Sequence, residues 1–287
     1  EKYPTEPSWT TVTHRMAKKG DVLFSVRAPV GELNIANKDC CIGRGVAAIR
    51  SKNNQTDYLY FLLKSHIEQI KRFGNGSVYD AVNKDTLEKI IINVFSDPQT
   101  QTRIAGVLSA YDDLIENNEK RIKTLEEMAQ FLYTEWFVKF KFPDHEKSKL
   151  IDSYTSYGPI PEGWEVRNLE SVIKLEKGIE PGSSSYKNFR GNNSVRFFRV
   201  GDLNRQPSET YIEYNVTKGI VCNSYDIVIT FDGATGVVGF GFEGSYSSGI
   251  RKIKYLDEDF NNPLFFYNYF RSEYVQNIIK NIIIKIT

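Results

Sequence analysis

The chain has 287 residues, of which 40% are hydrophobic and 25% are charged, a globular composition that excludes disordered and fibrous proteins. Its net charge of +1 gives no sign of a generally basic protein, so any nucleic-acid binding would depend on local charge. Apolar runs fall short of the roughly 18 residues of a membrane helix, the polar start predicts no secretory signal, and Cys40, Cys41 and Cys222 are expected as buried free thiols in the cytoplasm.

The first region, residues 1–96, is expected to contain strands, a helix and a turn-rich stretch. Residues 21–26 and 46–49 are β-type runs, whereas residues 58–72 carry apolar side chains at helical spacing. A glycine-rich turn ends this helix. The apolar run over residues 87–94 predicts a short strand.

Residues 97–141 are predicted to form a long spacer helix, opened by Asp97 as N-cap and Pro98 in the first turn. Two series of mostly apolar residues, each repeating every seven positions, make an a/d seam over five heptads, as in a left-handed coiled coil. A helix of about 38 residues spans on the order of 57 Å. The alternative is one amphipathic helix lying along a domain. The residues predicted to pack along the seam are Ile104, Leu108, Tyr111, Ile115, Asn118, Ile122, Leu125, Leu132 and Trp136.

A proline- and glycine-punctuated linker over residues 142–163 leads to a second globular region, residues 164–287. Its β-type runs cover residues 195–200, 226–231 and 236–242, and a helical segment follows at residues 263–280.

The second globular region repeats the first. The matches keep their order and their spacing: residues 21–25 with 226–230 and Gly31 with Gly236 at an offset of 205, residues 45–49 with 249–253 at 204, and residues 60–65 with 267–272 at 207. We therefore expect two copies of one domain. The alternative is chance likeness among strand–turn–helix units. Neither copy is complete, so the chain is expected to be a piece of a longer two-repeat protein or a truncated form of one.

Local charge differs between the regions. Residues 14–52 hold eight basic and three acidic residues, residues 174–205 seven and three, and residues 97–135 four and eight. Two basic regions separated by an acidic helix fit a protein that contacts DNA at two places. Ordinary unevenness of surface charge fits this distribution equally well.

None of the sequence motifs that would indicate a catalytic, nucleotide-binding or metal site is complete in this chain. Residues 239–244 read G-x-G-x-x-G, but the polar stretch that follows predicts a β-hairpin rather than a nucleotide-binding helix. Asn262-Pro263-Leu264-Phe265 lacks the second proline of an adenine-methyltransferase motif and is expected to cap a helix. The three histidines have no metal-ligand spacing. We therefore predict no catalytic residue, no metal and no cofactor.

Several segments resemble the specificity subunits of type I restriction-modification systems. Residues 160–166 (Ile-Pro-Glu-Gly-Trp-Glu-Val) resemble the entry to their target-recognition domains, and residues 199–203 resemble the early Arg-x-Gly-Asp of those domains. Residues 97–118 and 131–137 resemble the beginning and end of their spacer helix. Each motif is degenerate alone, but their order is specific and covers nearly the whole chain.

The resemblance implies an α+β fold: two related α/β target-recognition domains, mixed and strand-rich, separated by a long coiled-coil-type spacer helix. Residues 1–96 would be the C-terminal part of the first domain and residues 164–287 the N-terminal and middle part of the second. Relative to the family pattern, the chain lacks the opening of the first domain and the second helix. The seam would then be covered by the missing part of the chain or by a second copy of it.

The resemblance also implies a non-catalytic cytoplasmic subunit without a membrane partner. It would recognise a bipartite target in double-stranded DNA and direct adenine methylation by modification subunits or cleavage by a restriction and translocase subunit. The alternatives are a repeat adaptor that binds only proteins through the long helix, and a standalone methyltransferase, which the missing motifs disfavour.

The predicted DNA contacts are basic and polar residues near turns, in the residue classes that read base edges and bind phosphates. The alternative for each is a solvated surface residue, and Arg199 could instead be a structural partner of Asp202. The predicted contacts are Arg27, Arg44, Ser77, Tyr79, Asn83, Lys84, Lys177, Lys187, Arg190, Arg199 and Arg251.

Overall fold

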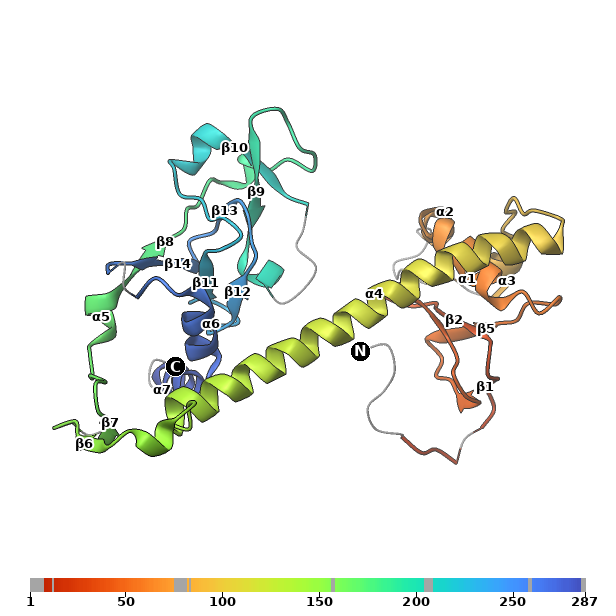
Figure 1. Ribbon diagram of the computed structural model, residues 1–287. Coiled ribbons are helices and arrows are strands. Elements are labelled where there is room, and N and C mark those ends of the chain that lie inside the picture. Colours follow the sequence, from red (N-terminus) through yellow and green to blue (C-terminus); the bar gives the residue numbers. More distant parts are fainter. Residues whose placement is uncertain are drawn as a thin grey trace. The chain divides into compact units, whose positions relative to one another are not determined.

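The computed structural model describes residues 8–11, 13–74, 82, 84–155, 158–203, 209–257 and 260–284 (Figure 1). The chain divides into two compact units, Glu1–Arg121 and Ile122–Thr287. The boundary between them falls inside the long helix α4 (Pro98–Tyr133). None of the helices in the described part of the chain has the length and apolar character that crossing a membrane requires.

Unit 1 is built on a three-stranded antiparallel sheet whose strand order is β3-β2-β5. The central strand alternates, so that Val22 and Phe24 are buried and pack with Leu63, Ile70 and Val82 in one core. A two-stranded ribbon of β1 with β4 completes the strands of this unit that the structure describes. The elements are β1 (Met16–Ala17), β2 (Val22–Ser25), β3 (Leu33–Ile35), β4 (Cys40–Cys41), β5 (Val46–Ile49), α1 (Thr56–Ser65), α2 (Ile67–Gly74) and α3 (Lys84–Lys89).

Unit 2 contains a four-stranded sheet, β12-β11-β14-β8, and a three-stranded sheet, β10-β9-β13. Every residue of β11 is buried. Its Ile227 and Ile229 face helices α6 and α7 on one side, and its Val228 packs on Phe198 and Tyr246 on the other (Figure 1). The elements are β6 (Leu150–Asp152), β7 (Pro159–Pro161), α5 (Leu169–Val172), β8 (Ile173–Lys177), β9 (Ser194–Phe198), β10 (Tyr211–Glu213), β11 (Ile227–Thr230), β12 (Val238–Phe240), β13 (Ser245–Tyr246), β14 (Ile250–Tyr255), α6 (Pro263–Arg271) and α7 (Glu273–Ile284), with short helical turns at Thr134–Val138, His145–Lys147, Ser183–Ser185, Val200–Leu203 and Tyr214–Thr217.

The predicted repeat is confirmed by strand register. Val22 faces Ile35 in unit 1, and Ile227 faces Phe240 in unit 2, so both strands are displaced by the predicted offset of 205. On the other side of the central strand, Leu23 pairs with Ala48 and Val228 with Lys252, which gives the predicted offset of 204 for the third strand. A helix pair follows the third strand in both copies. The two copies are therefore the same supersecondary unit.

Three predicted elements were wrong in detail. The apolar run at residues 87–94 is not a strand: α3 covers its beginning, and Leu87 and Ile90 pack on the unit 1 core without a neighbouring strand. The helices predicted over residues 58–72 and 263–280 each break, at His66 and at Ser272. Apolar spacing continues across both breaks, and periodicity therefore could not reveal them.

The loops between the first two strands of each copy, residues 26–32 and 231–237, are here called the tip loops. The hydroxyl of Ser25 donates to Pro29 O at 2.6 Å and accepts from Glu32 N at 2.8 Å. Thr230 repeats both bonds, donating to Ala234 O and accepting from Val237 N at 2.9 Å. A hydroxyl that both donates and accepts satisfies backbone groups that no ladder reaches. Both tip loops thus close in the same way.

The long helix confirms its predicted beginning. Asp97 accepts hydrogen bonds from Gln99 N at 3.2 Å and Thr100 N at 2.9 Å, as an N-cap residue does. After Tyr133 the helix widens into one π-helical turn, Thr134–Val138. Its first half packs on unit 1 through buried Gln101 and Ala105.

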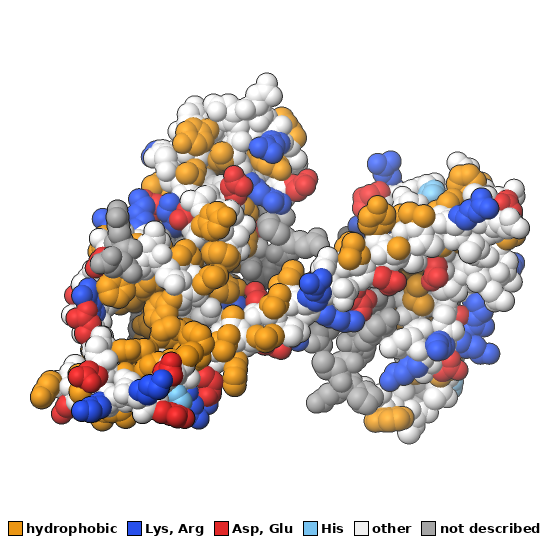
Figure 2. All heavy atoms as spheres, in the orientation of Figure 1, with side chains coloured by type: hydrophobic (Ala, Val, Ile, Leu, Met, Phe, Trp, Pro, Cys, Tyr) orange, Lys and Arg blue, Asp and Glu red, His pale blue; other side chains and the backbone are white. Residues whose placement is uncertain are grey.

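Most of the predicted seam of α4 lies on its exposed side, and apolar side chains reach the surface along the helix (Figure 2). Tyr111 is 64% exposed and Leu125 is 61% exposed, whereas Ile104 is half-buried. Helix packing through this seam stays a prediction. The seam residues on the exposed side are Leu108, Tyr111, Ile115, Asn118, Ile122, Leu125, Leu132 and Trp136.

Substituting the tip-loop glycines by alanine is expected to lower the free energy of unfolding by about 1–2 kcal/mol. Gly31 and Gly236 have φ of +96° and +87°, and a Cβ would lie 3.0 Å from Ile67 Cγ2 and 3.2 Å from Ile279 Cγ2, respectively. Urea unfolding of Gly31→Ala and Gly236→Ala measures the loss. Gly43→Ala is the control, because a Cβ there meets no atom within 4 Å. Equal losses at all three positions would contradict this account of the loops.

Candidate nucleic-acid interface

In unit 1, the structure brings Arg27 and Arg44 to the same end of the sheet. Val26 N donates to Gly45 O at 2.9 Å, which joins the tip loop to the turn before β5. Arg27 and Arg44 flank this bond, and both side chains are exposed. Neither arginine has an ion pair or a side-chain hydrogen bond to any residue in the described ranges. They are therefore available to an external anion.

The equivalent end of unit 2 gathers three more of the predicted contacts. Phe231 N donates to Gly249 O at 2.8 Å, the counterpart of the bond in unit 1. The guanidinium of Arg251 lies 5.3 Å from the centre of the Phe231 ring. Lys177 on β8 faces Arg251 in the strand register, so two like charges are paired across the sheet.

Arg199 reaches the same end through its neighbour Val200, whose side chain lies 3.6 Å from the Cβ position of Gly233 in the tip loop. Arg199 N donates to Asp202 Oδ2 at 2.8 Å, and its Nε lies 4.0 Å from the same oxygen. The structural partnership with Asp202 is thus present. Half of the Arg199 side chain stays exposed, at 52%.

The remaining predicted contacts lie elsewhere. Lys187 forms an ion pair with Glu213 and exchanges backbone hydrogen bonds with Tyr211, so its charge is already neutralised. Arg190 is exposed in the turn before β9, beside Phe189, which is 67% exposed. Lys84 begins α3, and its side chain lies outside the described residues, as do Ser77, Tyr79 and Asn83.

One exposed charge was missed by the sequence analysis. Asp232 lies in the second tip loop at the position of Arg27 in the first, displaced by 205 residues. Its carboxylate has no hydrogen-bond or ion-pair partner among the residues that the structure describes. The repeat offset, applied to Arg27, would have found it.

Other charges of the two basic regions serve the interior. Arg50 binds Asp21 through two nitrogens, at 2.6 Å and 2.7 Å. This bond is the main reason why the pKa of Asp21 lies below its ordinary value. Asp21 also accepts a hydrogen bond from Lys18 N at 2.8 Å. The ion pair of Arg50 with Asp21 therefore stabilises the turn before β2, and Arg50 is not a free cation.

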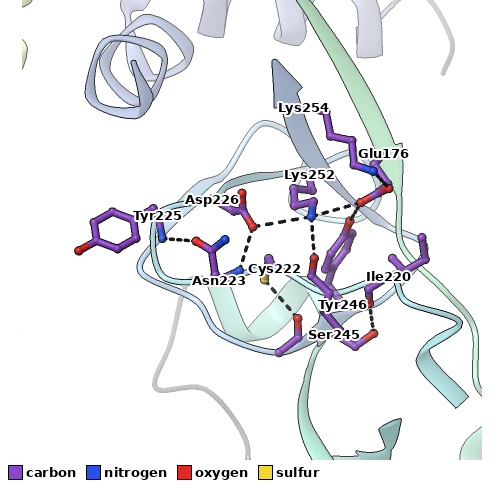
Figure 3. A network of polar contacts seen from close by, with 12 residues as sticks. Glu176, Ile220, Cys222, Asn223, Tyr225, Asp226, Ser245, Tyr246, Lys252 and Lys254 are labelled. Carbon is purple, nitrogen blue, oxygen red and sulfur yellow. Dashed lines mark hydrogen bonds and ion pairs between the residues drawn. The ribbon is translucent and has the colours of Figure 1, made fainter. Parts of the chain in front are cut away.

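In unit 2 a larger polar network replaces this pair (Figure 3). Lys252 is only 13% exposed; its Nζ donates to Val221 O at 2.6 Å and lies 3.4 Å from Glu176 and 3.7 Å from Asp226. Burial alone would raise the pKa of Glu176, but hydrogen bonds from Lys254 and Tyr246 and the charge of Lys252 outweigh burial and hold that pKa below its ordinary value. The network ties β8, β13 and β14 together and contributes no free cation at the sheet end.

The thiols divide differently from the prediction. Cys222 is buried, and its Sγ donates to Gly244 O at 3.4 Å. Cys40 is half-buried and Cys41 is exposed, so the buried thiols predicted at these two positions were wrong. Their strand β4 has two residues, and within the described ranges its one partner strand is β1, which leaves little to cover it. Over the described residues, no cluster of histidine, cysteine and carboxylate side chains could hold a metal ion.

Both motifs have structural roles, but residues 239–244 do not form the predicted β-hairpin, because β12 pairs with β11 whereas β13 pairs with β9 in the other sheet. In residues 239–244, Gly239 sits against Val228 and Phe242, and a Cβ on Gly244 would lie 2.3 Å from Arg196 O. The motif therefore packs strands closely. Asn262 caps α6 by accepting from Phe265 N at 3.0 Å, with Pro263 in the first turn.

Comparison with known proteins gives matches to the same family, the DNA specificity proteins of type I restriction-modification systems. Residues 13–127 and 161–285 match the family model of the type I restriction modification DNA specificity domain. The MjaIX specificity subunit of a type I restriction enzyme from Methanocaldococcus jannaschii is 34% identical over 206 residues, which are 71% of this chain and 46% of that protein. The HindI specificity subunit from Haemophilus influenzae is 28% identical over 254 residues, 66% of this chain and 54% of that protein. The chain thus spans about half the length of these curated relatives.

The fold is also similar to a crystal structure of the S subunit of a type I restriction-modification system from M. genitalium. The TM-score is 0.52 with 16% sequence identity, over 94% of this chain and 67% of that chain. At this identity the likeness concerns the fold. It agrees with the predicted α+β arrangement, in which a long helix lies between two strand-rich regions in chain order.

Alkylation should separate the thiols. We expect iodoacetamide to modify exposed Cys41 in the folded protein but to leave Cys222 unmodified, because removal from water raises the pKa of the Cys222 thiol to about 12 and the thiolate is the reactive form. Peptide mass spectrometry measures both sites, and protein unfolded in urea is the control in which both react. Equal rates in the folded state would contradict the burial of Cys222.

Proposed function

The chain belongs to the family of type I restriction-modification DNA specificity proteins, and from this membership we propose that it selects the DNA target of a type I restriction-modification complex. The observation that carries the proposal is the repeated sheet end. Two copies of one scaffold each present exposed charged side chains beside a tip loop. Two readers of related structure match a target that is read in two halves.

The first copy would contact DNA through Arg27 and Arg44, which have no partner among the described residues. Exposed arginines can bind phosphates or the major-groove edge of guanine without first breaking an internal ion pair. In the second copy Lys177 and Arg251 are direct cross-strand neighbours. Like charges in that position destabilise a sheet, and a phosphate between them would remove the repulsion.

We propose the following division of the chain. Residues 1–96 belong to the first target-recognition domain, and residues 97–141 contain the spacer helix, which ends at Val138. Residues 142–163 are a linker, and residues 164–287 belong to the second domain. The 36 residues of α4 correspond to about 54 Å. That length exceeds one ~34 Å turn of DNA, so the helix could fix the spacing between two half-sites.

We propose that partner subunits in the cytoplasm carry out the methylation and cleavage reactions. Modification subunits would methylate adenine at the selected target, and a restriction and translocase subunit would cleave unmodified DNA. The chain itself contributes selection and assembly, without a catalytic residue or a bound cofactor. The competing function is an adaptor that binds only proteins. It predicts no DNA binding and is tested by the DNA-binding measurement described below.

The exposed seam of α4 would be covered by a second long helix. For the 287-residue chain by itself we propose that this helix comes from a second copy, through an antiparallel coiled coil. Apolar side chains such as Ile122 and Leu125, which are 58% and 61% exposed, would be buried in that pairing. Their burial gives the association its free energy.

For the chain together with its modification subunits, the logarithm of the DNA-binding constant is expected to fall linearly with the logarithm of the salt concentration. Alanine at Arg27 and Arg44, or at Lys177 and Arg251, should lower the affinity about tenfold or more, because each pair removes two cationic contacts. The change in affinity is measured by fluorescence anisotropy, with DNA duplexes that carry the sequence motif methylated by the assembled complex.

Lys38→Ala is the matched control for the unit 1 pair. Lys38 is an exposed cation in the same copy but follows β3, at the opposite end of that strand from the tip loop. Salt-independent binding, or unchanged affinity in both double variants, would reject the proposed interface. Absence of DNA binding by the intact assembly would favour the protein-only adaptor.

Self-association should depend on the seam. The chain of 33.0 kDa is expected to show about twice that mass by light scattering. The double variant Ile122→Lys, Leu125→Lys is expected to give the monomer mass, because it puts charges where apolar side chains would meet. Glu119→Lys, an exposed position beside the seam, is the control and should remain dimeric. A monomeric wild-type chain would exclude the second copy as the cover.

A further inference from the structure

We propose that Arg27 and Asp232 are the specificity-determining residues of the two copies, each reading one base in one half of a bipartite target. This inference rests on the proposed function, since it names side chains that would carry out the selection. It goes further by assigning one position of the repeat, occupied by different residues in the two copies, to base reading.

The two residues occupy the same place on the same scaffold. Each is the second residue of its tip loop, and each loop is closed by a side-chain hydroxyl at its base. Gly31 N donates to Ser25 O at 3.0 Å, and Gly236 N donates to Thr230 O at 2.8 Å. Arg27 and Asp232 therefore hold the same position between equivalent closing hydrogen bonds, although their charges are opposite and the backbone after them differs, with Ala28–Pro29 cis in the first loop and Gly233 at a φ of +63° in the second.

Both side chains are exposed, and neither has a partner among the described residues. Asp232 is next to Phe231, whose ring lies under the guanidinium of Arg251, yet no ion pair joins Asp232 to that arginine. The charge of Asp232 is therefore not used in an ion pair within the described part of the chain. Its place at the loop tip suits contact with another molecule.

The acidic residue is the more informative of the two. A carboxylate repels the phosphates of DNA, so it weakens any binding that depends on the backbone alone. Among the groups of a DNA groove it can accept a hydrogen bond from an exocyclic amino group, above all N4 of cytosine. Asp232 lies at the same end of the sheet as Lys177, Arg199 and Arg251, and it is therefore suited to read a base while these cations hold the phosphates.

Arg27 suits the complementary base. Arginine donates two parallel hydrogen bonds to O6 and N7 of guanine in the major groove. We therefore assign guanine to one position of the half-site that the first copy reads, and cytosine to one position of the half-site that the second copy reads.

Methylation mapping of the genome tests the assignment, with the intact protein and its modification subunits produced together. Arg27→Gln should convert one guanine of the motif to adenine, since glutamine pairs with N6 and N7 of adenine. Asp232→Asn should convert one cytosine to adenine, and Asp232→Arg should convert it to guanine. Each change should alter the methylation ratio between old and new base by about 10-fold to 100-fold, in one half-site only.

Two variants serve as matched controls. Lys38→Gln and Glu243→Gln remove one exposed charge of the same sign from the far ends of β3 and β12, and they should leave the motif unchanged. If the wild-type assembly methylates no bipartite motif, the proposed function fails. If it does so and Arg27→Gln and Asp232→Asn keep that motif, only the present inference fails.

A uniform loss of methylation at every site would also overturn the inference, because it indicates a phosphate contact or a structural role. Thermal unfolding of each purified variant assigns such a loss to one of these two causes. Binding of the variants to duplexes altered at one position at a time then gives the base preference independently of methylation.

Discussion

Closure of the tip loop is the constraint on which each copy of the repeat depends. A single hydroxyl, from Ser25 or Thr230, satisfies two backbone groups of its loop. The same closure puts a buried glycine with positive φ against the second helix of the pair. Central strand, loop and helix are thereby fixed to one another through backbone groups of the loop, such as Pro29 O and Ala234 O, and the side chains of Arg27 and Asp232 form no hydrogen bond to the described residues.

This arrangement separates structural charges from available ones. Asp21 with Arg50 in one copy, and the network around Lys252 in the other, lie away from the tip loops and join turns to strands. Counting charge along the sequence gave all of these residues equal weight. In the structure Arg50 and Lys187 form ion pairs, whereas Arg27 and Arg44 have no ion-pair partner among the described residues. The local excess of positive charge near the proposed interface is thus smaller than the sequence suggests, and more concentrated.

Sequence reasoning succeeded where a pattern has a single structural outcome. The offsets of 205 and 204 predicted the strand registers of both copies, because a shift by one residue would turn every buried side chain outward. It failed where apolar periodicity is shared between structures: residues 87–94 have strand-like composition but no strand to pair with, and nothing in the spacing marks the helix breaks at His66 and Ser272. Asp232 was missed because the search for DNA contacts favoured basic residues.

A loop whose closing hydrogen bonds use tip backbone rather than tip side chains has a consequence for specificity. The tips read Arg-Ala-Pro at residues 27–29 and Asp-Gly-Ala at residues 232–234, yet their closing hydrogen bonds are the same. In the proposed interface, replacing Arg27 or Asp232 would therefore change what the loop offers to DNA while the closing hydrogen bonds are kept. Because the two copies belong to different compact units, a change in one tip leaves the other reader intact. Under the proposed function, a bipartite target read by two such units would change one half at a time, which a single continuous binding surface would not allow.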